Sequence, residues 1–540
     1  MNHKFVIHWA FGSLVFLAMG WVHGQSQLLV PSQFATIQGA VNAAFSGDEI
    51  LVAPGTYYGT IQFGDKRLRV VSSGGPNVTI LDGAGQGPII SWVALTYSTT
   101  RNHIEGLTIR NGVSTTTIMI DYPCGTVFGV TIPCPSGLDR TAGGAIYGSG
   151  AFCDIRNCIF INNSAQTGGA IYFSSTSNDS MIEDCDFIGN TATPYPGVLT
   201  SSYSVAFDGG SAIHAFYVVG LSTGPAATAS IARCNFDGNY FNGPSASVGG
   251  GGCVWVKGGI RAIQGCTFVN NYSSNTNDCC LKVLNSVTSI VNCIVQGNSV
   301  GGLRVVNGGE ASIRNCRVAT NSGHGLYIGI GGGLVVDGCA VIGNSGTGLV
   351  VASEIGQSLF GDVSITRSLI ESNGSGAVLY RSFGYDMRPV VSFCSIVNNG
   401  MIPMTGTVPF GFVGGLAILN SYFPQFSASV RGSIIRQNGG VEVLINPMAM
   451  STVEHCNILG GAPGVGNIDA APLFVDAAGG DYHLLPTSPC VAAASAVGLA
   501  AGALDLHVPA LQADLAVADI GVAQHFVHAG RVLCKQQPYA

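Results

Sequence analysis

The residues best suited to chemistry occupy one position of an internal repeat. In each copy they directly follow an aliphatic residue of a β-rich segment. Side chains alternate between the two faces of a strand, so if the aliphatic residues face a core, their successors face outward. The successors are Tyr147, Tyr172, His214, Trp255, Lys282, Arg304 and Tyr327. Neighbouring strands lie about 4.8 Å apart, so these seven residues would form one continuous row, termed here the outer stripe.

Aromatic faces and cations in one row suit an extended acidic polysaccharide, because rings offer stacking surfaces and cations pair with carboxylates. A second interpretation is structural: the side chains stack on one another and pack beneath inserted loops. Exposed aromatic clusters usually have a partner, which keeps binding open for the stripe as a whole. Beyond Tyr327 the aromatic and basic character ends, with Val350, Ala417 and Glu442 assigned to the equivalent positions.

Catalysis on such a stripe would suit an elimination reaction. A lyase needs a base to remove the proton α to a carboxyl group, and a cation or Ca²⁺ to stabilise the enolate. Lys282, Arg304 and His214 are the candidate catalytic residues, and Asp208 and Asp278 the candidate metal ligands. Apart from Ca²⁺ in a lyase, no cofactor is expected. The alternative for each charged residue is an ordinary solvated charge.

The stripe depends on a repeat, seen first in Ile155–Phe173. An aliphatic residue is followed three positions later by Cys, two further on by an aliphatic or Phe, and then by Asn, a Gly-rich gap and a β-rich run. The Cys and Asn pairs include Cys158/Asn163, Cys185/Asn190, Cys234/Asn239, Cys266/Asn271, Cys293/Asn298, Cys316/Asn321 and Cys339/Asn344. Copies are as little as 23 residues apart, and stacking such short units buries a continuous core.

Each repeat position predicts a local structure. The residue before the Cys is often Asn, Asp or Gly, types that tolerate left-handed backbone and so permit a sharp bend. The seven cysteines are expected to form one buried, unbridged row of small apolar residues. The recurring Asn suits an internal ladder, in which each amide bonds to turn backbone or to the next Asn.

With this repeat, the chain resembles the right-handed parallel β-helix (pectin-lyase-like) superfamily over about residues 28–490. The resemblance implies an all-β, single-stranded solenoid with three strands per coil. In polysaccharide-degrading members, the strand face that carries the outer stripe binds substrate. Residues 34–82 resemble the N-terminal cap of such proteins, including pectinesterases, with a helix at Thr36–Phe45. No Asp-Phe-Ile-Phe-Gly or Gln-Asp-Thr follows, so esterase activity is not supported.

One short motif resembles a catalytic signature of polygalacturonases. Gly323-His324-Gly325 matches their Gly-His-Gly, but Gly346-Thr347-Gly348 and Gly374-Ser375-Gly376 occupy the same repeat position. The glycines are therefore assigned to the turn. The sequence also lacks an Asp-Asp pair to supply an inverting acid and base.

Four segments are predicted: a signal peptide at 1–24, a cap with the first coils at 28–100, repeats with insertions at 101–466, and a C-terminal capping segment at 467–540. The apolar run at 5–19 is short for a membrane span, which favours cleavage and export over an uncleaved anchor. Insertions at 113–142, 191–208 and 240–250 follow the Asn and should project from one turn. Residues 467–494 resemble a segment of exported bacterial β-helix proteins, with Ala471 and Ala492 where acidic residues are usual.

The low charge content of the chain limits the kinds of molecule that it can bind. Only 9% of residues are charged and the net charge is −7, which gives no basic surface for nucleic acid. We expect a secreted or cell-surface monomer without a membrane span after signal cleavage. Cys124 and Cys134, close together in a non-repeating insertion, are the best candidates for a disulfide in an oxidising compartment.

Three functions follow from these patterns. The first is a secreted protein that binds an extracellular, acidic polysaccharide along the outer stripe. The second is a polysaccharide lyase or glycoside hydrolase of the pectin-lyase-like type. The third is a non-catalytic structural surface protein, for which the stripe would be dispensable.

Overall fold

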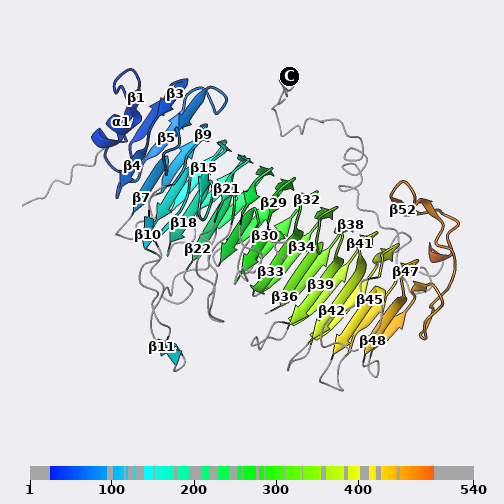
Figure 1. The fold of residues 1–540 in the computed structure, drawn as a ribbon. Coiled ribbons are helices and arrows are strands. Elements are labelled where there is room, and N and C mark those ends of the chain that lie inside the picture. The colour runs from blue at the N-terminus through cyan, green and yellow to red at the C-terminus, as the bar shows by residue number, and fades with distance from the viewer. Residues whose placement is uncertain are drawn as a thin grey trace, which may run out of the picture.

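The chain winds into an elongated stack of coils, each of which passes in turn through three long parallel sheets (Figure 1). The computed structural model describes residues 25–93, 101–114, 117–119, 126–127, 130–131, 139–150, 152–175, 180–193, 210–217, 229–242, 252–257, 260–274, 279–284, 288–308, 310–330, 333–353, 361–381, 387–401, 413–420, 427–446 and 451–491. Consecutive coils are joined by parallel pairing with corresponding residues side by side, such as Ile155 beside Ile182. The predicted parallel β-helix is therefore confirmed.

The strands are grouped by sheet. Sheet A contains β1 (Gln27–Val30), β2 (Glu49–Val52), β5 (Arg69–Ser72), β8 (Asn102–Glu105), β15 (Cys153–Arg156), β19 (Met181–Glu183), β23 (Ala229–Ala232), β27 (Ile260–Gln264), β31 (Thr288–Val291), β34 (Ala311–Arg314), β37 (Leu334–Asp337), β40 (Gly361–Thr366), β43 (Met387–Ser392), β46 (Ser429–Arg431) and β49 (Thr452–Glu454). Sheet B contains β3 (Gly55–Tyr58), β6 (Thr79–Asp82), β9 (Thr108–Arg110), β16 (Ile159–Ile161), β20 (Asp186–Ile188), β24 (Asn235–Asp237), β28 (Thr267–Val269), β32 (Ile294–Gln296), β35 (Arg317–Ala319), β38 (Ala340–Ile342), β41 (Leu369–Glu371), β44 (Ser395–Val397), β47 (Ile434–Arg436) and β50 (Asn457–Ile458). Sheet C contains β4 (Ile61–Gly64), β7 (Ile90–Val93), β14 (Ile146–Ser149), β18 (Ile171–Ser175), β22 (Ile213–Tyr217), β26 (Val254–Lys257), β30 (Cys279–Leu284), β33 (Gly301–Gly308), β36 (Leu326–Ile330), β39 (Thr347–Ser353), β42 (Ser375–Arg381), β45 (Val413–Asn420) and β48 (Val441–Asn446).

A short additional sheet, termed sheet D, lies along the chain between sheets B and C and was not predicted. It is formed by β17 (Ser164–Ala165), β21 (Thr191–Ala192), β25 (Tyr240–Phe241) and β29 (Tyr272–Ser273). The predicted insertions at 191–208 and 240–250 thus begin too early, because their first two residues continue the ladder. The predicted insertion at 113–142 contains antiparallel pairs, β10 (Thr117–Met119) with β13 (Asp139–Thr141) and β11 (Thr126–Val127) with β12 (Val130–Thr131).

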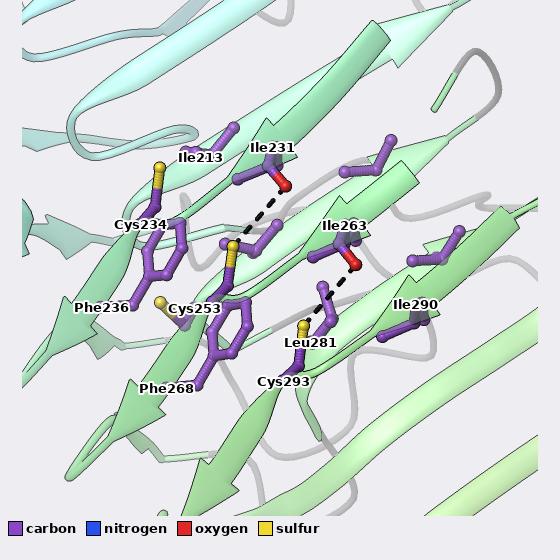
Figure 2. Close-up of a cluster of buried hydrophobic side chains, with 14 of the residues drawn as sticks. Ile213, Ile231, Cys234, Phe236, Cys253, Ile263, Phe268, Leu281, Ile290 and Cys293 are labelled. Atoms are coloured by element: carbon purple, nitrogen blue, oxygen red, sulfur yellow. Dashed lines mark hydrogen bonds between the residues drawn. The ribbon is translucent and has the colours of Figure 1, made fainter. Parts of the chain in front are cut away.

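The interior is filled by identical or similar side chains stacked coil upon coil. Phe160, Phe187, Phe236 and Phe268 form a stack with ring centroids 4.6–4.8 Å apart. Figure 2 shows two of these rings beside the isoleucine and cysteine rows. The spacing matches the distance between strands, so each coil packs its apolar residues against the next and none needs a core of its own.

The predicted bends and the cysteine row are both confirmed. Asn157, Asn292 and Asn315, which precede cysteines, have φ values of 49°, 55° and 51°. All seven predicted cysteines are buried and unbridged. The Cys293 thiol, for example, lies 3.6 Å from the Ile263 carbonyl oxygen (Figure 2). It also lies 3.4 Å from the Val291 carbonyl oxygen. The left-handed bend lets the aliphatic residue and the Cys three positions later both face inward.

The asparagine ladder is also confirmed, and its geometry repeats in each coil. In Asn271, the backbone N–H and the side-chain Nδ2 both donate to Oδ1 of Asn298, at 2.9 and 3.0 Å. Nδ2 also donates to the Phe236 carbonyl oxygen in the preceding coil, at 3.0 Å. One amide therefore joins three consecutive coils. The ladder runs through Asn163, Asn190, Asn239, Asn271, Asn298, Asn321, Asn344, Asn373, Asn399 and Asn438.

The N-terminal end carries the predicted helix, shortened to α1 (Ile37–Ala43). Thr36 is its N-cap, and its hydroxyl oxygen accepts a hydrogen bond from the Gly39 N–H at 3.0 Å, as N-cap residues do. Ile37, Ala40 and Val41 are buried in the same core that continues through the coils. Placed beside β1 and β4 (Figure 1), the helix covers apolar residues of the first coil.

The C-terminal segment continues the last coil and then folds back over the outside of sheet B. Ile468 pairs with Asn457 of β50, after which β51 (Phe474–Asp476) and β52 (Asp481–Leu484) form an antiparallel hairpin. Tyr482 is buried against outward residues of sheet B, where its hydroxyl donates to Glu371 and accepts from Asn398. No helix within the described ranges has the length and apolar character needed to cross a membrane.

We expect Asn298→Ala to lower the free energy of unfolding by about 3 kcal/mol, because buried donors of Asn271 and the Phe268 carbonyl lose their partner. Urea unfolding followed by circular dichroism measures the change. The exposed Asn42→Ala on α1 is the matched control and should shift the midpoint little. Equal shifts in both variants would contradict a stabilising ladder.

The cysteine row should not react with maleimide in the native protein. Every thiol of the row is buried, so the reagent cannot reach it. For Cys394 and Cys456, burial also raises the pKa, to about 12 and about 11, which keeps their reactive thiolate form scarce. Mass spectrometry after labelling, with and without urea, provides the measurement. Labelling of Cys293 or Cys316 without urea would show that the row is open to solvent.

Candidate functional site

The parallel register brings the outer stripe together as one row on the outer face of sheet C. Consecutive members are direct neighbours: Tyr147, Tyr172, His214, Trp255, Lys282, Arg304 and Tyr327. The preceding aliphatic residues, such as Ile171 and Leu303, are buried, as the alternation required. The side chain of His214 falls outside what the structure describes.

The predicted end of the row is partly wrong. Val350 and Ala417 lie in it, but the next position is Leu444 rather than Glu442. The register between β45 and β48 shifts. Counting positions along the repeat does not reveal such a shift, so the predicted residue was wrong. Glu442 instead faces the end of the asparagine ladder, where Asn438 donates to it through its backbone N–H at 3.2 Å and through Nδ2 at 2.6 Å.

Exposure divides the stripe into two parts. Tyr172, Trp255 and Lys282 are only 3%, 2% and 5% exposed. Tyr147 is half-buried and stacks on Tyr172, with ring centroids 5.8 Å apart and planes within 2°. Arg304 and Tyr327 are also only partly buried. Among the described side chains, the stripe is therefore more exposed toward its C-terminal end, and we call Arg304, His324 and Tyr327 the short-turn window.

The window coincides with a change in turn length. Four residues separate Asn298 from Leu303, and four separate Asn321 from Leu326, whereas nine separate Asn271 from Leu281. The short turns leave no room for an insertion over this part of sheet C. Their glycines lie in the turn, as predicted, and packing also requires them: a Cβ on Gly325 would lie 2.5 Å from the Val341 side chain.

Within the window, a cation, a ring and an imidazole lie together. The Cζ atom of Arg304 is 4.6 Å from the centroid of the Tyr327 ring, a cation–π arrangement. The His324 ring centroid is 6.2 Å from that of Tyr327. Partial desolvation by surrounding atoms and the nearby Arg304 charge lower the pKa of His324 below its ordinary value, although the residue is exposed at the surface. His324 is therefore a neutral imidazole near pH 7.

The hydrogen bonding of His324 fixes which nitrogen is free. The backbone N–H of Thr347 donates to Nδ1 at 3.0 Å, so the proton of the neutral ring is on Nε2. His324 thus offers a donor and no available lone pair. Together with the guanidinium of Arg304 and the Tyr327 hydroxyl, the window can bind anionic or hydroxyl oxygens, but its imidazole is not placed to act as a base.

His324 was set aside in the sequence because its glycines belong to a turn. That assignment is correct for the glycines, but it left the histidine without a role. A signal was available: His324 lies eight residues after Cys316, and Arg304 lies eleven after Cys293. Because the two positions are in adjacent coils, stacking brings them to the same surface.

The predicted metal ligands and the predicted disulfide lie in parts of the chain that the structure does not describe. Asp208 and Asp278, the candidate metal ligands, and Cys124 and Cys134, the candidate disulfide, lie outside the described residues. Within the ranges that the structure describes, no cluster of three or more His, Cys, Asp or Glu residues could hold a metal ion. Calcium binding and the disulfide therefore stay predictions.

Comparison with known proteins supports the fold. Residues 252–426 match the family model described as a right handed beta helix region. The chain is a right-handed parallel β-helix protein. A search of curated proteins finds no match to the sequence.

Solved structures that resemble this β-helix protein include three carbohydrate-active enzymes. The periplasmic alginate epimerase AlgG shares 10% identity over 80% of this chain and 85% of its own, with a TM-score of 0.35. A mannuronic acid specific polysaccharide family 6 lyase from human gut microbiota shares 12% identity over 83% and 92%, with a TM-score of 0.38. A GH87 alpha-1,3-glucanase of Streptomyces thermodiastaticus shares 12% identity over 80% and 65%, with a TM-score of 0.36. At these values the likeness concerns the fold and says nothing of what this chain binds.

The pKa of His324 should depend on Arg304. Arg304→Ala removes a neighbouring positive charge, so protonation of His324 costs less and its pKa should rise. Titration of the histidine ring protons by NMR measures both midpoints. Arg388→Ala, an exposed arginine on sheet A, is the control. An unchanged titration midpoint of His324 in Arg304→Ala would show that the Arg304 charge does not influence the pKa of His324.

Proposed function

We propose that this β-helix protein is exported and binds an acidic extracellular polysaccharide at the short-turn window. The proposal rests chiefly on one arrangement: the Arg304 guanidinium over the Tyr327 ring, on a part of sheet C where both side chains are only partly buried. A guanidinium binds carboxylates through paired N–H donors. The ring below it limits the side chain to few orientations, which reduces the entropy lost on binding.

His324 adds to the same surface. Its Nε2–H is a neutral donor beside a cation, and together they suit a ligand with a carboxylate and neighbouring hydroxyl groups. Repeating uronic acid units have this combination. The buried stripe residues Tyr172, Trp255 and Lys282 lie on one side of the window and are not proposed to stack on sugar rings.

The hydrogen bond from Thr347 to His324 favours binding over elimination. A lyase would need a base with a free lone pair, and Nδ1 of His324 already accepts a hydrogen bond. Two other candidate bases lie on the stripe: Lys282, which is 5% exposed, and His214, whose side chain is outside what the structure describes. If the protein is nevertheless a lyase, incubation with polyuronates would release unsaturated products that absorb ultraviolet light. A purely structural role predicts neither binding nor products.

Export is proposed from the sequence of residues 1–24, in which a short apolar run follows a basic start, as in a cleaved signal peptide. Fractionation of cells with an antibody against the chain tests location. N-terminal sequencing of the exported protein tests cleavage after residue 24. Retention of the whole chain in the cytoplasm would overturn this part of the proposal and leave the binding surface unaffected.

We expect Arg304→Ala to weaken binding of polyuronates about tenfold or more, because a charge-assisted contact contributes about 1.5–3 kcal/mol. Affinity electrophoresis against an array of acidic and neutral polysaccharides, followed by calorimetry with oligouronates, gives the measurement. Arg304→Lys should recover only part of the affinity, since an ammonium cannot pair a carboxylate through two parallel N–H donors.

The matched control is again Arg388→Ala, which removes the same charge from a different sheet. It should leave binding within about twofold of the unchanged protein. Equal losses in Arg304→Ala and Arg388→Ala would mean that net charge, not the window, governs binding. No binding to any acidic polysaccharide would favour the structural alternative.

A further inference from the structure

Two tyrosines interrupt the pattern of sheet D. The residue after the ladder asparagine is Ser, Thr or Gly in most coils, including Ser164, Thr191 and Ser299. In two consecutive coils it is Tyr240 and Tyr272. Since small residues satisfy the repeat at this position, the rings are not required by the fold.

The rings form an outward ridge along two coils. Tyr240 pairs directly with Tyr272 in sheet D, and their centroids are 5.0 Å apart with planes inclined at 44°. Tyr272 is 50% exposed. Inward-facing neighbours Phe241 and Ser273 are buried, so the core is closed beneath the ridge and the tyrosines themselves are not part of it.

Small side chains flank the ridge on both sides. Thr191 precedes Tyr240 in the sheet. On the other side, the Ser299 N–H donates to the Asn271 carbonyl oxygen at 3.0 Å, which places Ser299 next to Tyr272 in the following coil. Among the described residues, the neighbour of Tyr272 on that side is therefore a serine, whereas on the other side it is the ring of Tyr240.

The polar groups around the ridge are acceptors and amides. The Tyr240 hydroxyl donates to Asn242 Oδ1 at 3.1 Å. On the adjoining edge of sheet B, Asn270 Nδ2 donates to Asp237 Oδ1 at 3.2 Å. A carboxylate and amides can accept from and donate to sugar hydroxyl groups, whereas the Asp237 charge would repel a uronate.

We propose that Tyr240 and Tyr272 form a second saccharide-binding surface, which takes an uncharged hexose chain. The aromatic surfaces supply stacking, and Asp237 with Asn242 and Asn270 supplies hydrogen bonds to hydroxyl groups. The surface lies on sheet D and its edge with sheet B, while the short-turn window lies on sheet C. Its occupation does not depend on the proposed binding of acidic polysaccharide.

The test uses neutral hexasaccharides of glucose, mannose and galactose, with hexagalacturonate as the acidic comparison. We expect Tyr272→Ala to weaken binding of a neutral hexasaccharide about three- to tenfold, the size expected when one stacking ring is lost. Arg304→Ala should leave that affinity unchanged. Hydroxyl-radical footprinting on the full chain should show protection of Tyr240 and Tyr272 when the sugar is present.

Two control variants sharpen the test. Tyr58→Ala removes a tyrosine that is 74% exposed on β3 and should not change binding. Asp237→Asn keeps the shape of the side chain and removes its charge, so hexagalacturonate should bind this variant better than the unchanged protein. Tyr272 is outside the core, and an unchanged urea midpoint would show that Tyr272→Ala is folded.

Three results would overturn the proposal. One is that no neutral hexasaccharide binds or protects the tyrosines. Another is that Tyr58→Ala and Tyr272→Ala weaken binding equally. The third is that Tyr272→Ala changes the sedimentation coefficient of the chain, which would make the ridge a contact between two copies. Loss of uronate binding in Arg304→Ala with neutral-sugar binding retained would instead support both surfaces separately.

Discussion

The coil-to-coil register, held by the asparagine ladder, is the constraint on which the rest of the structure depends. Each amide bonds to the coil before it and to the coil after it, as Asn271 does with the Phe236 carbonyl and Asn298. A coil that slipped by one residue would bury its polar face and break these bonds together. The register therefore fixes which outward residues become neighbours. Any binding surface on the coils is made of these outward side chains, because the inward ones form the core.

The length of the turns then decides which neighbours are exposed. Where nine residues separate the ladder asparagine from sheet C, as between Asn271 and Leu281, the stripe residue Lys282 is buried. Where four residues do, Arg304 and Tyr327 are partly open. The two proposed surfaces flank this change of turn length. Tyr272 belongs to the coil with a nine-residue turn directly before this change, and Arg304 belongs to the first coil with a four-residue turn after a ladder asparagine.

Much of the fold and part of the site could be predicted, because a repeat converts spacing in sequence into contact in space. The cysteine row, the left-handed bends, the ladder and the order of the outer stripe all follow from corresponding positions in successive copies. The errors arose where that correspondence fails. Glu442 follows a shift in register, and Tyr240 was counted with an insertion because nothing in one copy marks a two-residue strand.

The sequence alone thus determined the internal rows and the identity of stripe neighbours, since both depend only on period and alternation. Tertiary structure decided which of those neighbours are open. Trp255 and Arg304 occupy equivalent positions, yet one is 2% exposed and the other only partly buried. It also decided that His324 is a donor beside Arg304, because its Nδ1 accepts from Thr347 in the next coil. Covering loops and hydrogen bonds between coils are not periodic, so no repeat encodes them.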